Sequence, residues 1–130
     1  MSAPADRMPL LLVEDADDVA LIVDYLLRRE GHAVERAADG RRAAERIRTG
    51  PPPPLVILDL MLPHHDGFEL LGMLRAQPGW ESVPVVVLSA RTQEEDVVRA
   101  FESGASDYVV KPFRPRELLA RIRRLLRGGP

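Results

Sequence analysis

Four short apolar runs in this 130-residue sequence each end at a polar or charged side chain that could do chemistry. Glu14 and Asp15 follow the first run, Asp59 follows the second, Ser89 the third and Lys111 the last. Such runs are typical of buried parallel strands. Because the carboxyl ends of parallel strands meet at one edge of a sheet, we expect these side chains to share a site there.

The residue types at this edge indicate phosphoryl chemistry. Three carboxylates repel one another, and a single lysine cannot neutralise them, so a hard cation such as Mg²⁺ is expected. A Mg²⁺ ion with open positions, a lysine and a hydroxyl together form a receptor for phosphoryl oxygens. The sequence has no glycine-rich phosphate loop, so a bound nucleotide is not expected. We therefore predict that Asp59, at the end of a central strand, itself accepts a phosphoryl group.

Lys111 is the only lysine among the 18 basic residues of the chain, and the other basic residues are all arginine. A lysine retained against such a bias indicates a position where a compact ammonium cannot be replaced by the wide guanidinium fork.

The elements that must position these side chains alternate along the sequence. Strands are predicted at residues 10–13, 32–37, 55–58, 83–88 and 107–110. Helices are predicted at residues 19–30, 40–49, 68–76, 92–103 and from 115 onward, with Thr92 and Glu95 forming a capping box. Five strands alternating with five helices predict a doubly wound α/β sandwich, with a mostly parallel sheet covered on both faces.

Composition excludes several other classes of protein. With 20 acidic and 18 basic residues the net charge is −2, so no bulk field draws the chain onto nucleic acid. The absence of cysteine excludes disulfides, thiol catalysis and cysteine-based metal sites. No apolar run approaches the roughly 20 residues that a membrane helix needs, and the first residues lack a signal-peptide pattern. We expect a soluble cytoplasmic protein of one domain.

Short motifs around these residues resemble the receiver domain of two-component response regulators. The resemblance covers about residues 8 to 127. It is carried by Val13-Glu14-Asp15, Leu58-Asp59-Leu60-Met61-Leu62-Pro63, Gly67, Ser89-Ala90, Tyr108 and Lys111-Pro112-Phe113.

The resemblance implies a flavodoxin-like (βα)5 fold with a five-stranded parallel sheet in the order 2-1-3-4-5. It implies a receiver domain over residues 8–127, with flexible tails at 1–7 and 128–130. The expected activity is that of a phosphorylation-dependent signalling switch, not a turnover enzyme. The expected partner is a sensor histidine kinase or a phosphotransfer protein.

The resemblance also assigns roles at the site. Asp59 would be the phospho-acceptor, and Mg²⁺ would be held by Glu14, Asp15, Asp59 and the backbone carbonyl of Met61. Glu14 stands where aspartate is commoner in the family, which changes the length of that ligand. Lys111 would pair with the acceptor carboxylate and then with a phosphoryl oxygen.

Three further expectations concern switching. The bond between Lys111 and Pro112 would be cis, which costs little before proline. Ser89 would swing its hydroxyl onto the phosphoryl group, and Tyr108 would rotate into the space that Ser89 vacates. The face built from the fourth helix, fifth strand and fifth helix would then repack, and it could serve as a homodimer interface.

Other functions remain as alternatives. The motif at residues 111–118 resembles receivers that precede winged-helix DNA-binding domains, so the chain could be the N-terminal receiver of a longer transcriptional regulator. Ser106, Val97 and Val98 lack the charges expected for the salt-bridged dimer of that group. We expect no direct nucleic-acid binding by this chain. An interaction module that works without phosphorylation is a further alternative.

Two enzyme-like or cofactor-binding readings are disfavoured by particular residues. An FMN carrier would need a phosphate at the first loop, where the acidic run at 14–18 would repel it. An aspartyl phosphatase of the haloacid dehalogenase type needs a second acid where Met61 stands. His64 and His65 are predicted to lie in a solvent loop, because adjacent histidines do not converge on a metal.

Overall fold

A parallel sheet of five strands forms the centre of the computed structural model, which describes residues 8–127. The predicted tails at 1–7 and 128–130 lie outside the described residues. The strand order β2-β1-β3-β6-β7 is the predicted order 2-1-3-4-5. The five strands are β1 (Leu10–Val13), β2 (Val34–Ala37), β3 (Val56–Asp59), β6 (Val85–Ser89) and β7 (Asp107–Val110).

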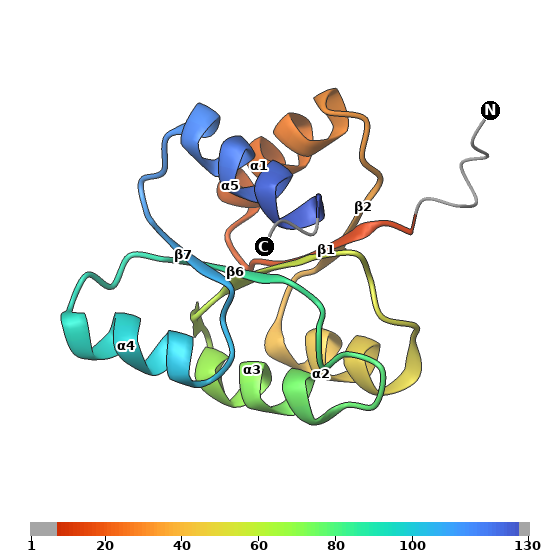
Figure 1. The fold of residues 1–130 in the computed structure, drawn as a ribbon, viewed down its shortest axis with the longest axis vertical. Helices are drawn as coiled ribbons and strands as arrows, with labels where there is room; N and C mark the ends of the chain where they lie inside the picture. The colour runs from red at the N-terminus through yellow and green to blue at the C-terminus, as the bar shows by residue number, and fades with distance from the viewer. Residues whose placement is uncertain (1–7, 128–130) are drawn as a thin grey trace.

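Five helices cover the sheet on both faces, as the doubly wound prediction requires (Figure 1). Helices α1 (Asp17–Arg29) and α5 (Pro115–Leu126) lie on one face. Helices α2 (Gly40–Thr49), α3 (Gly67–Ala76) and α4 (Glu94–Glu102) lie on the other. Within the described part of the chain, no helix has both the length and the apolar character needed to span a membrane.

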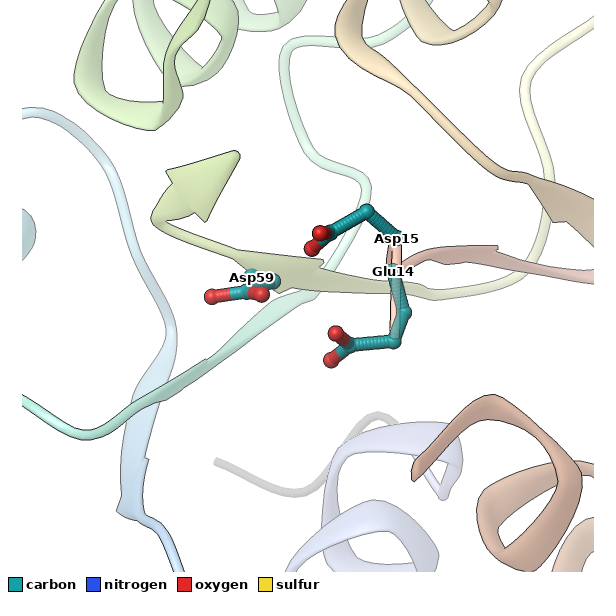
Figure 2. A group of neighbouring side chains, drawn as sticks. All are labelled: Glu14, Asp15 and Asp59. Atoms are coloured by element: carbon teal, nitrogen blue, oxygen red, sulfur yellow. The ribbon is translucent and has the colours of Figure 1, made fainter. Parts of the chain in front are cut away.

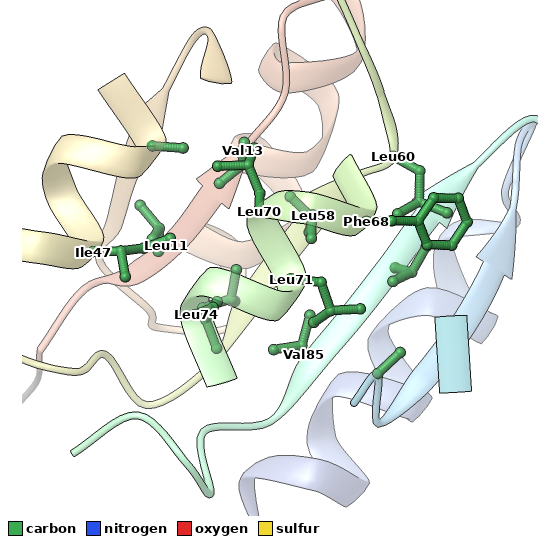
Figure 3. Close-up of a cluster of buried hydrophobic side chains, with 14 of the residues drawn as sticks. Leu11, Val13, Ile47, Leu58, Leu60, Phe68, Leu70, Leu71, Leu74 and Val85 are labelled. Carbon is green, nitrogen blue, oxygen red and sulfur yellow. The ribbon is translucent and has the colours of Figure 1, made fainter. Parts of the chain in front are cut away.

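The hydrophobic core has two layers because alternate strand residues point to opposite faces of the sheet. Leu11 and Val13 of β1 pack towards α2 and α3, together with Leu70, Leu71 and Leu74 of α3 (Figure 3). Leu10 and Leu12 of the same strand join the layer beneath α1 and α5. Strands buried on both faces explain why the sequence shows continuous apolar runs there.

A small hairpin after β3 was not predicted. Strands β4 (Met61–Leu62) and β5 (His65–Asp66) pair antiparallel, and Pro63 and His64 form the turn between them. His64 has a positive φ of 64°, and proline followed by a residue with positive φ is typical of a type II turn. The hairpin replaces the predicted solvent loop, although both histidines remain exposed.

The predicted capping box at the start of α4 is wrong. The helix begins at Glu94 with Gln93 as its N-cap, and no side chain caps it. The first-turn backbone bonds run from Asp96 and Val97 to the carbonyl of Gln93, at 3.1 and 3.2 Å. Thr92 therefore lies one residue outside the cap position. The acidic residues of the first turn interact favourably with the helix dipole, without a capping hydrogen bond.

The amino ends of β6 and β7 are joined by Arg75 of α3. Its guanidinium donates to the carbonyl of Gly104 at 2.7 Å and to that of Trp80 at 3.0 Å. Gly104 has a φ of 112°, and a Cβ there would lie 2.8 Å from the Arg75 side chain. Trp80 is fully buried, with the guanidinium carbon of Arg46 5.6 Å from its ring centroid. This packing lies at the edge of the sheet opposite the predicted site.

Candidate functional site

Three carboxylates meet at the carboxyl edge of the sheet. Glu14 and Asp15 directly follow β1, and Asp59 is the last residue of β3. These strands are neighbours, with Val13 opposite Leu58, so the three side chains turn towards a common space (Figure 2). One oxygen from each carboxylate lies within 4.8 Å of the other two. The strand ends thus bring together the acids that the sequence pattern assigned to one edge.

Two of these acids are deeply buried. Glu14 is 1% exposed and Asp59 is 3% exposed, whereas Asp15 is half-buried. Burial raises the pKa of Glu14 above its ordinary value, and the charge of Asp59 raises it further. The contacts of Glu14 with Lys111 and with the backbone of Ala16 act in the opposite direction without cancelling the rise. The negative charge of Glu14 is therefore less favourable at this position than in water.

Lys111 supplies the positive charge at the cluster. Its Nζ lies 3.0 Å from Glu14 Oε1 and 3.3 Å from Asp59 Oδ2. Burial works against the charge of Lys111, but the contact with Glu14 and the charges of both acids outweigh it and raise its pKa. The backbone fixes this position, since the amide of Lys111 donates to the carbonyl of Ser89 at 2.8 Å. The predicted cis bond to Pro112 is confirmed.

The cluster fits a hard divalent cation. Glu14 Oε2 accepts a hydrogen bond from the Ala16 amide at 3.1 Å. Glu14 Oε1 is buried and has the Lys111 ammonium as its charged partner at 3.0 Å. The same ammonium is shared with Asp59, so one positive charge faces three converging carboxylates, and a divalent cation would offset the remaining negative charge. The donor set is entirely oxygen, which suits Mg²⁺.

The backbone after Asp59 holds this carboxylate in place. Its Oδ1 accepts a hydrogen bond from the Met61 amide at 2.9 Å. Directly beside it, the amide of Gly67 donates to the carbonyl of Leu60 at 3.1 Å. A Cβ at Gly67 would lie 2.4 Å from the Cα of Leu60, so only glycine permits this approach of the two backbones. The close approach of the two backbones thus explains why glycine stands eight residues after Asp59.

Ser89 and Tyr108 meet at the backbone of Arg91. The Ser89 hydroxyl, which is fully buried at the end of β6, accepts a hydrogen bond from the Arg91 amide at 3.1 Å. The Tyr108 hydroxyl donates to the Arg91 carbonyl at 2.9 Å. Tyr108 is 9% exposed and already packs within the core layer. Both hydroxyls are therefore engaged by one residue of the loop after β6.

Sequence reasoning missed Arg36, at the end of the edge strand β2. Its Nε donates to the carbonyl of Glu14 at 3.0 Å, and its Nη2 donates to the carbonyl of Asp15 at 3.2 Å. The same Nη2 forms an ion pair with Asp17 Oδ1 at 2.9 Å. Carbonyl acceptors leave no pattern of side chains in a sequence, so no spacing rule points to this arginine.

The two histidines lie apart from the acid cluster. His64 and His65 line a shallow groove beside the β4–β5 hairpin, together with Arg91 and Arg99. Arg99 stacks on the Phe68 ring, with its guanidinium carbon 4.0 Å from the ring centroid. A Cβ on Gly40 would clash with the side chain of His65, so this histidine packs against the start of α2. That they form no metal site with one another stays a prediction.

Comparisons with known proteins give a consistent result. A family described as the response regulator receiver domain matches residues 10–123. The chain is 45% identical over 121 residues to the DNA-binding response regulator MtrA of Mycolicibacterium smegmatis, covering 93% of this chain and 51% of that protein. The chain thus spans about half the length of the relatives it matches.

Solved structures show the same fold. A CheY-like response regulator receiver domain protein from Methanospirillum hungatei has a TM-score of 0.86 and 26% identity, over 94% of this chain and 95% of that one. The receiver domain of the sensor histidine kinase PA1611 from Pseudomonas aeruginosa has a TM-score of 0.83 and 29% identity, over 92% and 98%. That structure contains a magnesium ion coordinated in its active-site cleft.

Proposed function

This chain belongs to the response regulator receiver domain family, and from that premise we propose that it is a phosphorylation-dependent signalling switch with Asp59 as its phospho-acceptor. The observation that carries the proposal is the meeting of Glu14, Asp15 and Asp59 within 4.8 Å, beside the only lysine of the chain. A sensor histidine kinase or a phosphotransfer protein is the proposed donor.

The proposed metal ligands are Glu14, Asp15, Asp59 and the backbone carbonyl of Met61. The burial of Glu14 and Asp59 around one shared ammonium supports this assignment, as does the magnesium in the related PA1611 receiver. When bound, Mg²⁺ would supply positive charge next to the oxygens of the phosphoryl group. Glu14 is one methylene longer than aspartate, but the Ala16 amide holds its Oε2, so the longer side chain still has a fixed position.

In the proposed reaction, an oxygen of Asp59 attacks the phosphorus of a phosphohistidine. A P–O bond forms as the P–N bond breaks, and the electron pair of the broken bond stays on the imidazole. The imidazole leaves as a neutral base, because its other ring nitrogen carries the proton. Lys111, 3.3 Å from Asp59 Oδ2, is suited to contact a phosphoryl oxygen with its compact ammonium.

Ser89 and Tyr108 are the proposed switch residues. The Ser89 hydroxyl would leave the Arg91 amide and donate to the phosphoryl group instead. Because Tyr108 binds the carbonyl of the same Arg91, a shift of this loop reaches both side chains. The proposed response is a repacking of the face formed by α4, β7 and α5, and its supporting observation is the exposure of Val98, Phe101 and Val110 there.

The same face could join two copies of the chain. Sedimentation velocity before and after phosphorylation tests this homodimer.

The alternative role, as the N-terminal receiver of a longer DNA-binding transcriptional regulator, is favoured by the match to about half of MtrA. In that role, phosphorylation of Asp59 would act on the attached half through this face.

The experiment that tests the acceptor is intact-mass measurement after incubation with acetyl phosphate. It compares the wild-type protein with Asp59→Asn, each with Mg²⁺ and with EDTA. We expect one phosphoryl group to be added to the wild type with Mg²⁺ and none to Asp59→Asn. Asp18→Asn is the matched control, because Asp18 is an exposed acid of the same acidic run outside the cluster.

Two outcomes would contradict the proposal. Addition to Asp59→Asn would assign the acceptor to another residue. No addition to the wild type, from acetyl phosphate or from a phosphorylated histidine kinase, would favour the alternative of an interaction module that works without phosphorylation.

A further inference from the structure

We propose that Arg36 is a positioning residue for the acidic pair Glu14 and Asp15, and that it raises the affinity of the site for divalent cations. Arg36 belongs to β2, the edge strand, and it reaches the loop after the neighbouring strand β1. The inference rests on the proposed metal site. It concerns how that site is held in shape rather than which atoms bind the cation.

The geometry that carries the inference is a two-pronged contact with consecutive backbone carbonyls. The Nε and Nη2 atoms on one side of the guanidinium donate to the carbonyls of Glu14 and Asp15, at 3.0 and 3.2 Å. These are two of the three residues whose side chains form the cluster (Figure 2). The contact therefore fixes the orientation of both peptide groups that set the direction of the carboxylates.

Other bonds make Arg36 part of a closed arrangement. The Glu14 amide donates to the carbonyl of Ala37 at 3.2 Å, which extends the pairing of β1 and β2 to this point. The Ala16 amide binds the Glu14 side chain from within the loop at 3.1 Å. Asp17 pairs with Arg36 at 2.9 Å and offsets its charge. Arg36 binds the carbonyls of Glu14 and Asp15, which these other bonds do not engage.

Charge and position predict opposite effects of removing Arg36. A nearby positive charge opposes the binding of a cation, so an arginine acting only through its charge would weaken Mg²⁺ binding. An arginine acting through its two hydrogen bonds would strengthen it, because residues that orient metal ligands contribute strongly to metal affinity. The sign of the change in affinity therefore identifies the mechanism.

The experiment compares wild-type protein with Arg36→Met and Arg36→Lys by calorimetric titration with MgCl₂. Binding of Mn²⁺, followed by the loss of the free-ion electron paramagnetic resonance signal, provides a second readout. We expect the dissociation constant for Mg²⁺ to rise about tenfold in Arg36→Met. It should also rise in Arg36→Lys, because an ammonium keeps the charge but cannot donate to both carbonyls in the geometry of a fork.

Arg28→Met is the matched control. Arg28 also pairs with an acid of α1, Asp24, and donates to a carbonyl of β2, that of Val34, at 3.1 Å. Within the residues that the structure describes, Arg28 forms no hydrogen bond or ion pair with the acidic loop after β1 (residues 14–16). Its loss therefore changes the net charge equally without freeing Glu14 or Asp15. We expect the Mg²⁺ dissociation constant of this variant to stay within about twofold of the wild type.

Each outcome has a distinct meaning. An unchanged or lower dissociation constant in both Arg36 variants, with a wild type that binds Mg²⁺, would overturn the role of Arg36 and leave the proposed function intact. A wild type that binds neither Mg²⁺ nor Mn²⁺ would overturn the proposed metal site itself. Thermal unfolding of each variant shows whether it is folded, and Arg36→Lys keeps the test valid where Arg36→Met does not fold.

Discussion

The two halves of the site differ in how firmly they are held. The half on β1, β2 and β3 is fixed by many bonds, among them those of Arg36 to the acidic loop and of the Met61 amide to Asp59. The half on β6 and β7 holds Lys111 through the bond of its amide to the Ser89 carbonyl, but the hydroxyls of Ser89 and Tyr108 both contact the backbone of exposed Arg91. We call the first half the rigid half, because its carboxylates keep one arrangement. We call the second the exchangeable half, because its two hydroxyls can change hydrogen-bond partners.

This difference indicates how the two halves divide their tasks. A group of like charges needs rigid surroundings, because any relaxation would let the carboxylates separate and lose a common cation. A hydroxyl that must change partner needs neighbours whose contacts cost little to break. The following substitutions test this division.

The largest effect is expected from Gly67→Ala in the rigid half. The added Cβ would lie 2.4 Å from the Cα and 2.6 Å from the carbonyl oxygen of Leu60, so backbone must move. We expect a loss of about 3 kcal/mol in the free energy of unfolding, measured by urea denaturation. Gly72→Ala is the control, since nothing lies within 4 Å of its Cβ and the helix should gain about 0.5 to 1 kcal/mol. Equal effects would mean that the approach of these backbones is not tight.

The next effect is a pH dependence that originates at Glu14. Because burial and Asp59 raise the pKa of Glu14 above its ordinary 4.5, the folded protein holds this proton more tightly than the unfolded chain. The stability of the wild type relative to Glu14→Gln should therefore be greatest below pH 4.5. It should fall as the pH rises through the raised pKa. Urea denaturation in EDTA over this pH range measures it, and a rise with pH would contradict the prediction.

A smaller effect is expected from Tyr108→Phe in the exchangeable half. The variant loses the hydrogen bond to the Arg91 carbonyl, which should cost about 1 kcal/mol of unfolding free energy. Titration with MgCl₂ should give the same affinity as the wild type, because the acidic loop is held by other residues. A changed Mg²⁺ affinity would show that the two halves are coupled and would remove the distinction between them.

The smallest effect is expected from Arg91→Ala. Its side chain makes an exposed ion pair with Asp96 at 3.3 Å, whereas its backbone makes the contacts with both hydroxyls. The free energy of unfolding should stay within about 0.5 kcal/mol of the wild type. A loss as large as that of Tyr108→Phe would mean that the Arg91 side chain, and not only its backbone, holds the exchangeable half.

Strand ends were predictable from the sequence because they combine two strong signals. Runs such as Leu10–Val13 and Val56–Leu58 are wholly apolar, and each is followed by a charged side chain. Parallel pairing then fixes which edge those side chains share. The acid cluster follows from this topology, with Lys111 beside it.

The contacts that hold the site in shape were not predictable in the same way. Arg36 and the hydroxyls of Ser89 and Tyr108 bind backbone atoms, whose positions depend on the finished fold rather than on residue type. The β4–β5 hairpin has strands of two residues, too short for any alternation to appear in the sequence. The start of α4 was misplaced because Thr92 and Glu95 match the spacing of a capping box, whereas the helix begins one residue later, after Gln93, with no side-chain cap.

The packing of Trp80 gives the protein an optical reporter of its own. It is the only tryptophan in the chain, and its buried indole lies beside Arg46 at the edge of the sheet away from the acid cluster. Its fluorescence should respond when the amino-end packing is lost and stay constant when a ligand binds at the carboxyl edge. Emission from this one residue therefore separates unfolding of the whole domain from events confined to the site.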